Sequence, residues 1–311
     1  MDNIKTIEFE QWMKKDIIKL FSEEYNLNFD YYNNKFERLY ENEFQKDKCI
    51  RVVAIIDSKI VGFQSYFYWP YKSDSIIYNS YQSGNSIVSE KFRGKGIFGL
   101  LLNKIEEIII KKDIDFLIGF PVKESIGSFK RKNWINNFNL KWYARLISLN
   151  PTIFIKKKRI SLNDTKSCFN LKNNGLFTIK NTPSFEFYRS QISNESKYHV
   201  FKEKEIIVEF CCKLSIRNKI ISELIIGNIQ FNKFDEEILN HAFNDLIKKI
   251  KASKSVNLIS FAISENNKLF NSILRVNKFK LLKKKIFFIY KNYKNIDLKD
   301  ILIFRADIDT W

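Results

Sequence analysis

Hydrophobic and polar positions along the first part of the chain predict helices followed by a β-hairpin. In residues 8–25 apolar side chains recur every three or four positions, which is typical of an amphipathic helix. The aromatic stretch 26–43 is predicted to be helical in part. Residues 50–56 and 60–67 are rich in β-branched and aromatic side chains, and the polar turn between them predicts that the two strands pair.

A further strand, residues 76–88, leads into a turn and a helix. Gly84 and Asn85 interrupt this strand, and an internal glycine often marks a bulge or a close backbone approach. The stretch 86–102 holds the strand end, the sequence Arg93-Gly94-Lys95-Gly96 and the start of an apolar helix that reaches about residue 111. Beyond it we expect a buried strand at 116–120, a short helix at 125–132 capped by Ser125, and a strand at 140–149.

The turn at residues 93–96 is suited to binding an anion. The first backbone amides of a helix lack an internal partner, and the helix dipole adds partial positive charge at the same end. Glycines permit a tight turn and a close ligand approach, while Arg93 and Lys95 add full charge. A plain turn with solvated charges is the alternative, but the combination of strand, glycines, cations and helix favours a pyrophosphate site.

The second half of the chain repeats this pattern. Residues 151–175 hold a proline, a basic run and many polar residues, so they read as a connection between domains at 1–150 and 176–311. Gly227 and Asn228 interrupt a strand as Gly84 and Asn85 do. The copy comprises an aromatic stretch at 185–188, a hairpin at 198–209, strands at 224–231, 256–262 and 281–290, and helices at 235–251 and 267–276.

The glycine turn is missing from the second copy. Its helix follows Asp235, Glu236 and Glu237, which suit a helix N-terminus electrostatically but would repel a phosphate. The second half is therefore expected to keep the fold, support the first half and form a wall for the acceptor substrate.

Composition and charge favour a globular protein with anionic partners. The chain has 311 residues, 45% of them hydrophobic, which suits two domains with sizeable cores. Its formal net charge of +18 favours nucleic acid, anionic lipid or phosphorylated small molecules. Basic clusters lie at 156–159 and 283–285, and the second is interpreted as solvated surface.

Cysteine and histidine usage predicts neither a disulfide framework nor a metal site. Four cysteines include an adjacent pair and no CxxC motif, and there are only two histidines, His199 and His241, both interpreted as structural. A reducing, cytoplasmic setting is the simplest interpretation. The N-terminal residues do not resemble a secretory signal, and no uncharged apolar run is long enough to predict a membrane span.

The strand, turn and helix of residues 86–102 resemble the acyl-CoA-binding motif of the GNAT superfamily of N-acetyltransferases. The family pattern is Q/R-x-x-G-x-G/A after a strand that ends in an apolar pair, and Arg93, Gly96 and Phe98 occupy its defined positions, with Phe98 in place of Gly or Ala. The resemblance covers residues 8–149 and, as a degenerate copy, the second half. It implies an α/β (α+β) fold of two tandem GNAT-like domains, each a mixed, mostly antiparallel sheet flanked by helices.

The resemblance also implies where acetyl-CoA would bind as the acyl donor. Backbone amides of the turn would hold the pyrophosphate, and the backbone of Ile87 and Val88 would pair with the pantetheine arm. The thioester would enter the gap between this strand and the strand at 116–120, where an amide would polarise its carbonyl. The implied cofactor-binding residues are Ile87, Val88, Arg93, Gly94, Lys95, Gly96, Ile97, Phe98, Ser125 and Phe129.

The catalytic groups are less defined by the resemblance. Phe129 stands where many members have the tyrosine that protonates the leaving thiolate, so Ser125, Ser128 or water would take its place, although both serines also suit simple helix-start positions. Candidates for the base that deprotonates the amine are Tyr81, Asn85 through a water, and Glu90, for which a salt bridge to Lys91 or Arg93 is the simpler interpretation. Tyr81, Asn85 and Ser128 are the catalytic residues that we predict.

The leading hypothesis is an acetyl-CoA-dependent N-acetyltransferase acting on a small amine. By analogy with two-domain members of bacterial surface-polysaccharide pathways, the acceptor would be an amino sugar, and an anionic nucleotide sugar would suit the basic chain. One alternative is a Fem-like aminoacyl-tRNA-dependent transferase, whose tRNA suits the charge but which needs no CoA turn. A non-catalytic acyl-CoA-binding module is the other alternative, because Phe129 replaces the usual acid.

Overall fold

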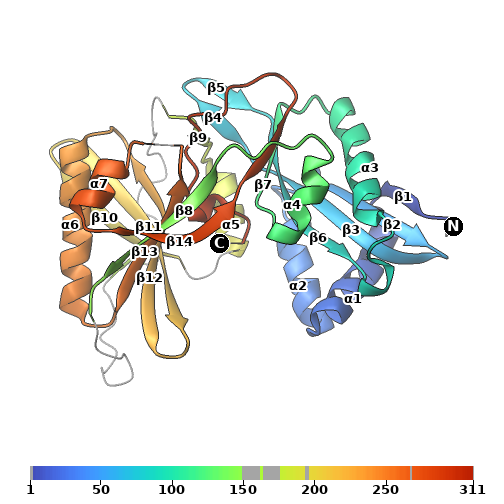
Figure 1. Cartoon of the computed structure of the whole chain (residues 1–311), viewed down its shortest axis with the longest axis horizontal. Coiled ribbons are helices and arrows are strands. Elements are labelled where there is room, and N and C mark those ends of the chain that lie inside the picture. The colour runs from blue at the N-terminus through green and yellow to red at the C-terminus, as the bar shows by residue number, and fades with distance from the viewer. Residues whose placement is uncertain (1–2, 149–161, 164–175, 193–195, 267, 311) are drawn as a thin grey trace.

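Two six-stranded mixed sheets, each flanked by helices, form the two lobes of the chain (Figure 1). A computed structural model describes residues 3–148, 162–163, 176–192, 196–266 and 268–310. The first sheet has the order β1 (Lys5–Glu8), β2 (Ile50–Ile56), β3 (Lys59–Tyr68), β6 (Ser80–Val88), β7 (Phe116–Gly119), β15 (Ile289–Asn292). The second has the order β10 (Lys197–Glu203), β11 (Ile206–Arg217), β12 (Ile221–Phe231), β13 (Leu258–Ser264), β8 (Asn139–Leu146), β14 (Lys280–Phe287). A small sheet joins β5 (Ile76–Tyr78), β4 (Tyr71–Ser73) and β9 (Thr178–Ile179).

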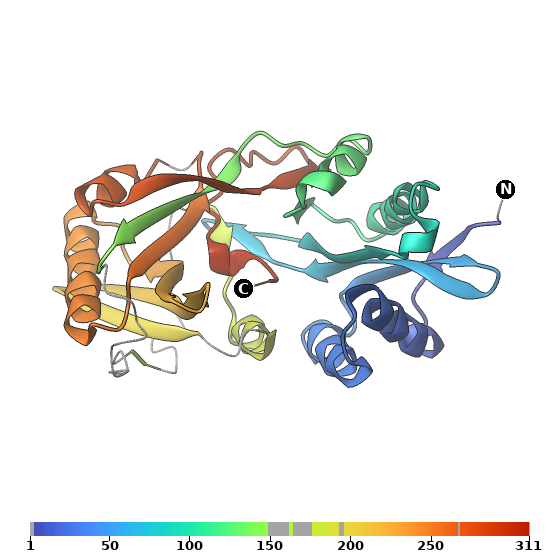
Figure 2. The ribbon, with the colours of Figure 1, turned by 60° about the horizontal axis from the view of Figure 1, so that its bottom comes forward.

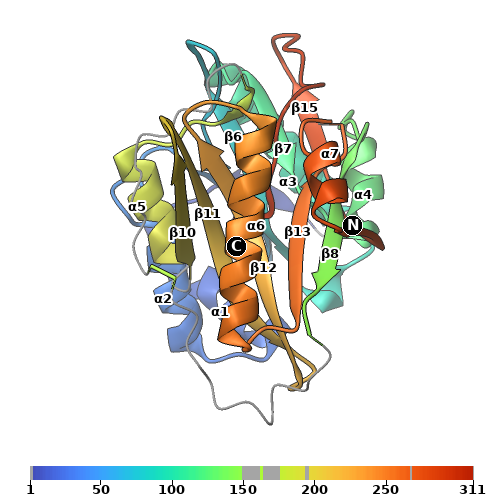
Figure 3. The ribbon, with the colours of Figure 1, turned by 90° about the vertical axis from the view of Figure 1, so that its left-hand side faces the viewer.

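Helices cover both faces of the first sheet (Figure 2). On one face lie α1 (Lys14–Tyr25) and α2 (Phe29–Tyr40), and on the other α3 (Ile97–Lys111) and α4 (Lys123–Lys130). In the second lobe α6 (Glu236–Ser253) packs along the sheet (Figure 3), near α7 (Asn271–Val276), while α5 (Pro183–Ile192) lies between the lobes. The short helices are η1 (Gln11–Met13), η2 (Glu90–Phe92) and η4 (Arg305–Asp307).

Alternation along the strands explains the two packed faces. Val53 and Phe63 belong to the buried cluster that contains α1 and α2, whereas Val52 and Ala54 belong to the cluster that contains α3. Side chains of a strand point to opposite faces in turn, so both faces can be apolar when helices cover both. The continuous apolar run at residues 52–56 of β2 is the sequence signal for this arrangement.

The two halves of the sequence exchange strands. β8 pairs antiparallel with β13 of the second sheet, from Leu258↔Leu146 to Ser264↔Leu140, and β15 pairs antiparallel with β7 of the first. Residues 140–149 are predicted in the first domain, but β8 lies in the second sheet. The strand predicted at 281–290 is divided: β14 lies in the second sheet, as expected, and only residues 289–290 belong to β15 of the first sheet. The strands of each sheet therefore do not all come from one side of the predicted limits 1–150 and 176–311. Most of the predicted connection 151–175 lies outside the described residues.

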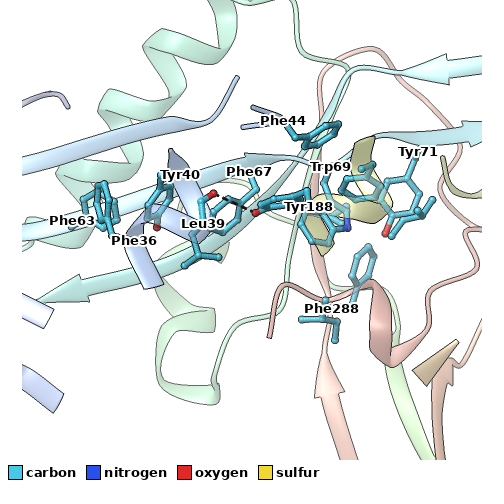
Figure 4. Close-up of a cluster of buried hydrophobic side chains, with 14 of the residues drawn as sticks. Phe36, Leu39, Tyr40, Phe44, Phe63, Phe67, Trp69, Tyr71, Tyr188 and Phe288 are labelled. Carbon is cyan, nitrogen blue, oxygen red and sulfur yellow. Dashed lines mark hydrogen bonds between the residues drawn. The ribbon is translucent and has the colours of Figure 1, made fainter. Parts of the chain in front are cut away.

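One aromatic core also crosses between the halves (Figure 4). Phe44, after α2, lies 5.1 Å from Phe185 and 5.5 Å from Tyr188 of α5, measured between ring centroids. Trp69 lies 5.0 Å from Phe185, and the Tyr188 hydroxyl donates to the Leu39 carbonyl at 3.5 Å. Burial of such rings is worth roughly 1.5–3 kcal/mol each, so the lobes stabilise one another.

Most of the expected elements are present, with local corrections. Strand β1, paired with β2, comes before η1 and α1. Helical structure therefore begins at Gln11 instead of residue 8. The short helix begins at Lys123 instead of residue 125, and its N-cap is Val122. Ser125 is thus not the cap, because its hydroxyl donates to the Val122 carbonyl inside the first turn.

Candidate functional site

The turn before α3 has the backbone that its glycines predict. Gly94 and Gly96 have φ angles of +80° and +78°, in the left-handed region that other residues enter only with strain. A Cβ atom on either glycine would meet no atom within 4 Å, so both positions face open space. No side chain caps the helix at Gly96 and its first turn holds no acidic residue, which leaves the first amides free for an anion.

A pocket of about 640 Å³ opens at this helix end. It brings together the predicted turn and residues at the end of α4, far from the turn in sequence. Cationic side chains of Arg93, Arg131 and Lys132 lie around it, and Ser128 faces it from α4. The other lining residues are Val88, Phe92, Gly94, Gly96, Ile97, Phe98 and Gly99.

Helix α1 holds the turn in place through Glu24. One carboxylate oxygen of Glu24 accepts from Arg93 Nη2 at 2.9 Å, and the other accepts from the Glu90 backbone amide at 2.9 Å. Arg93 Nε also donates to the Val88 carbonyl at 3.1 Å. The carboxylate that pairs with Arg93 is therefore that of Glu24, not of Glu90. Lys95 lies nearby, with its Nζ 5.3 Å from the Phe92 ring centroid.

Phe98 lines this pocket and packs against Phe129. Their ring centroids lie 5.4 Å apart in an edge-to-face arrangement, and Phe129 lies 5.0 Å from Trp134 in the same way. Phe129 is almost completely buried and does not line the pocket, and neither does Ser125. Ser128 does line it, and its hydroxyl accepts from Arg131 Nη2 at 3.0 Å. Of the serines considered as acids, only Ser128 is placed at the pocket.

The central strands separate beside the pocket. β6 and β7 pair in parallel only from Ser80↔Phe116 to Ser83↔Gly119, whereas β6 continues to Val88. On its other side β6 stays paired with β3, with Phe63 opposite Ile87. The edge of β6 beyond Ser83 therefore has no β7 partner, and this edge includes the backbone of Ile87 and Val88.

A bulge in β6 separates Tyr81 from Asn85. The register with β3 shifts between Phe63 and Ser65, and Asn85 has a φ of +50°. Tyr81 packs in the cluster under α3, whereas the Asn85 amide donates to Tyr40 of α2 at 3.2 Å. The expected alternation does not survive the bulge, so the two predicted catalytic residues lie on opposite faces. Burial also raises the pKa of Tyr81 to about 12, which disfavours a role as base.

An acidic residue that the sequence did not predict lies against the bulge. Asp309, in the segment after η4, has a carboxylate oxygen 2.7 Å from the position of a Cβ atom on Gly84. Burial, only partly opposed by Arg305 and Lys35, raises the pKa of this carboxyl to about 6. No local motif marks Asp309, because Gly84 and Lys35 are more than 200 positions earlier in the sequence.

Asp309 and Asn85 line a second pocket of about 270 Å³ on the α2 side. Lys35, Arg38 and Tyr31 of α2 contribute to the same wall. Next to it, Asn85 also borders an apolar recess of about 20 Å³ between α1, α2 and the sheet. Asn85 thus lies where the α2 side of the sheet meets the bulge in β6.

The second copy has no comparable anion site at its helix. The Asp235 side chain caps α6 by accepting from the Ile238 amide at 3.0 Å, so a carboxylate occupies the place that an anion would take. His199 and His241 each pair with a carboxylate at 2.9 Å, Asp245 and Glu203 respectively, and so link β10 to α6. Both histidines have structural partners, as expected.

The described part of the chain contains neither a candidate metal cluster nor a candidate membrane-spanning helix. No group of three or more His, Cys, Asp or Glu side chains is arranged to hold a metal ion there. No helix among the described residues is both long and apolar enough to cross a membrane.

Comparison with known proteins gives structural relatives only. No family model matches the sequence, and no curated protein matches it. A probable N-acyltransferase of unknown function from Enterococcus faecalis V583 has a TM-score of 0.68 and 12% identity, over 94% of this chain and 73% of the relative. A GCN5-related N-acetyltransferase from Anabaena variabilis has a TM-score of 0.64 and 11% identity, over 93% and 73%.

A third similar structure is Saccharomyces cerevisiae N-myristoyltransferase with bound myristoyl-CoA. Its TM-score is 0.56 and its identity 13%, over 94% of this chain and 83% of the relative. At these identities the likenesses establish the fold. The predicted fold class, with two GNAT-like mixed sheets flanked by helices, is confirmed.

Proposed function

We propose that this chain, which has the fold of the GCN5-related N-acetyltransferases, is an acyl-CoA-dependent N-acyltransferase. The observation that carries the proposal is the cation-lined pocket at the uncapped N-terminus of α3. It joins free helix amides, two glycines in the left-handed conformation and three basic side chains, which together suit a pyrophosphate. An opening between parallel strands directly beside it suits an extended pantetheine arm.

The donor would contact the cofactor-binding residues predicted from the sequence, with two exceptions. Arg93, Gly94, Gly96, Ile97, Phe98 and Val88 line the pocket, while Ile87 offers its backbone at the strand edge and Lys95 its charge. Phe129 packs against Phe98 without lining the pocket, and Ser125 lies outside it. Arg131 and Lys132 are additional residues that we assign to the phosphates.

A short acyl group fits the space beside the bulge. The recess next to Asn85 is apolar and has a volume of about 20 Å³, enough for one water-sized group. The methyl of an acetyl group matches one water in size, whereas a long acyl chain would require side chains of α1 and α2 to move. Acetyl-CoA is therefore the donor that we propose, as the sequence predicted.

Ser128 lines the pocket that we assign to the phosphates, and its hydroxyl accepts from Arg131, so we group it with the phosphate-binding residues. The thiolate leaves from the other end of the pantetheine arm, where water is the remaining candidate for its protonation. The acceptor would be a small amine, and an amino sugar on a nucleotide remains a proposal that rests on analogy. A Fem-like reaction would leave the phosphate pocket unused, and a non-catalytic module would bind acyl-CoA without turnover.

Calorimetric titration with acetyl-CoA and with S-acetylpantetheine tests the donor site. Arg131→Glu should weaken acetyl-CoA binding at least tenfold and leave the much weaker binding of S-acetylpantetheine unchanged, because only the former carries phosphates. Arg275→Glu is the matched control, since it makes the same charge change on the exposed surface of α7. If wild-type protein does not bind acetyl-CoA at millimolar concentration, the proposal is wrong.

Thiol release from acetyl-CoA then separates an enzyme from a binding module. The reaction should depend on an added amine, and a panel of amino sugars, amino acids, polyamines and peptides would identify the preferred class. Binding without amine-dependent thiol release across this panel would favour the non-catalytic module.

A further inference from the structure

We propose that the pocket between α2 and the segment 305–310 is the acceptor site, and that it binds a primary amine carrying a carboxylate or phosphate group, with Asp309 as the base. This inference rests on the proposed acyl-transfer function. It extends that function by naming the residue that takes the proton and the chemical class of the acceptor.

The first argument is the position of Asp309 on the central strand. Its carboxylate occupies the space above Gly84 that any other residue would fill with a side chain. Gly84 is the residue at which β6 loses its β7 partner and bulges, and the Gly84 carbonyl accepts from the Ser65 hydroxyl at 2.8 Å. A base placed here can reach an amine that approaches a thioester lying along the open edge of β6.

The second argument is that the segment is firmly anchored by buried polar groups. Asp307 is almost fully buried, accepts from the Phe304 amide at 2.8 Å and from Asn228 Nδ2 at 3.3 Å, and lies 3.7 Å from Arg189. Arg189 of α5 also donates to the Ala306 carbonyl. These contacts fix the C-terminal segment to α5, whose Phe185 and Tyr188 pack against Phe44 of the first half.

The third argument is the charge distribution in the pocket. Lys35 and Arg38 of α2 line the same 270 Å³ space as Asp309. Asp309 attracts an ammonium group, whereas Lys35 and Arg38 attract an anion on the same molecule. An acceptor with both charges satisfies the pocket, while a polyamine would place a second cation beside Lys35.

The proton balance of the reaction is simple. The acceptor ammonium loses one proton to the Asp309 carboxylate, and the free nitrogen pair attacks the thioester carbon. The carbon–sulfur bond breaks as the amide forms, the nitrogen loses its second proton, and that proton ends on the CoA sulfur. Asp309 then releases its proton to solvent, so the products are the amide, CoA thiol and one proton.

Asp309→Asn tests the base directly, with Asp300→Asn as the matched control on an exposed residue of the same region. Amine-dependent thiol release by Asp309→Asn should fall about 100-fold or more in kcat, with acetyl-CoA affinity within about twofold of wild type. Its remaining rate should lose the rise with pH that wild type shows near pH 6. Asp300→Asn should match wild type. Retention of the wild-type rate and pH profile by Asp309→Asn would overturn the proposal.

Paired amines test the acceptor class with otherwise similar molecules. We would compare glycine with glycinamide and O-phosphoethanolamine with ethanolamine. The anionic member of each pair should have a kcat/KM at least tenfold higher, and Lys35→Gln combined with Arg38→Gln should abolish this preference mainly through KM. Equal kcat/KM within both pairs would contradict the proposal.

These outcomes are distinguishable from a failure of the proposed function. If wild type binds no acetyl-CoA, the acyl-transfer proposal itself fails. If wild type acetylates amines but Asp309→Asn is unaffected or the anionic amines are not preferred, only the inference about the acceptor pocket fails.

Discussion

The carboxylate of Asp309 lies 2.7 Å from the place where a Cβ atom on Gly84 would be, although the two residues belong to opposite halves of the chain. Gly84 is thus the glycine that allows the C-terminal segment to reach the central strand. This Cβ position also lies 2.7 Å from the ring of Phe67, so Asp309 and Phe67 together leave no room for a side chain on residue 84.

Gly84→Ala should displace the Asp309 carboxylate or the Phe67 ring. We expect a loss of about 1–3 kcal/mol in the free energy of unfolding, as for other overpacked sites, and a large loss of amine-dependent thiol release. Urea unfolding and the thiol assay measure the two effects. Gly127→Ala is the control, because a Cβ atom there meets only Arg131 at 3.7 Å. An equal loss of activity in both variants would contradict this explanation.

Gly96→Ala and Gly99→Ala should have opposite effects on stability. Both added methyl groups face open space, but of the two glycines only Gly96 has a positive φ. Gly96→Ala should therefore lower the free energy of unfolding by about 1 kcal/mol. Gly99 lies within α3, where alanine is favoured over glycine by roughly 0.5–1 kcal/mol. Thermal unfolding of the protein without ligand measures both changes. A stabilising Gly96→Ala substitution would argue against the strained turn.

The rate of acyl transfer should rise with pH through the pKa of Asp309. Because burial raises this pKa to about 6 despite Arg305 and Lys35, kcat/KM should increase about tenfold per pH unit below pH 6 and level off above it. The groups that face Asp309 are Lys35 and Arg38 of α2, Arg305, Tyr188 of α5 and the Gln82 amide of β6. An activity that is independent of pH between 5 and 7 would rule out this base.

The same pKa shift predicts a stability change in Asp309→Asn. The folded pKa lies above the ordinary value of 3.8, so the folded state holds the proton more tightly, and stability falls as the pH rises from about 4 to 6. Asparagine carries no charge, so the substitution removes the free-energy cost of burying the ionised carboxylate at neutral pH. We expect Asp309→Asn to be about 1–2 kcal/mol more stable than wild type at pH 8 and equal to it at pH 4. Chemical unfolding at the two pH values would measure the difference.

Unfolding of the whole chain should be a single transition because the halves exchange β8 and β15. Ile289 of β15 is fully buried and its side chain packs against Gly119 of β7. Ile289→Ala should cost about 2–5 kcal/mol and shift the unfolding of both lobes together. Circular dichroism and tryptophan fluorescence should report one midpoint. Fluorescence samples both lobes, because Trp69 lies in the aromatic core between the halves and Trp142 lies on β8 of the second sheet. Two separate midpoints would contradict this coupling.

The sequence by itself determined the local parts of the molecule. Periodicity predicted most helices and strands, and the glycines at 84, 94 and 96 indicated a bulge and a turn because backbone conformation depends on few neighbouring residues. The repeat predicted two similar sheets, and the acidic residues 235–237 predicted a second copy without an anion site. The turn residues were recognisable because all of them lie within one short stretch.

Only the tertiary structure decided which strands share a sheet and which side chains meet at the bulge. A strand's pattern shows that it is buried but not which neighbour it pairs with, so β8 was predicted in the first sheet, and the first residues of β15 were predicted to continue a strand of the second. A bulge reverses alternation in a way that depends on the partner strand, so Tyr81 and Asn85 were placed together. Asp309 reaches Gly84 only because Asp307, Arg189 and Asn228 anchor its segment, and such contacts between distant residues leave no local signal.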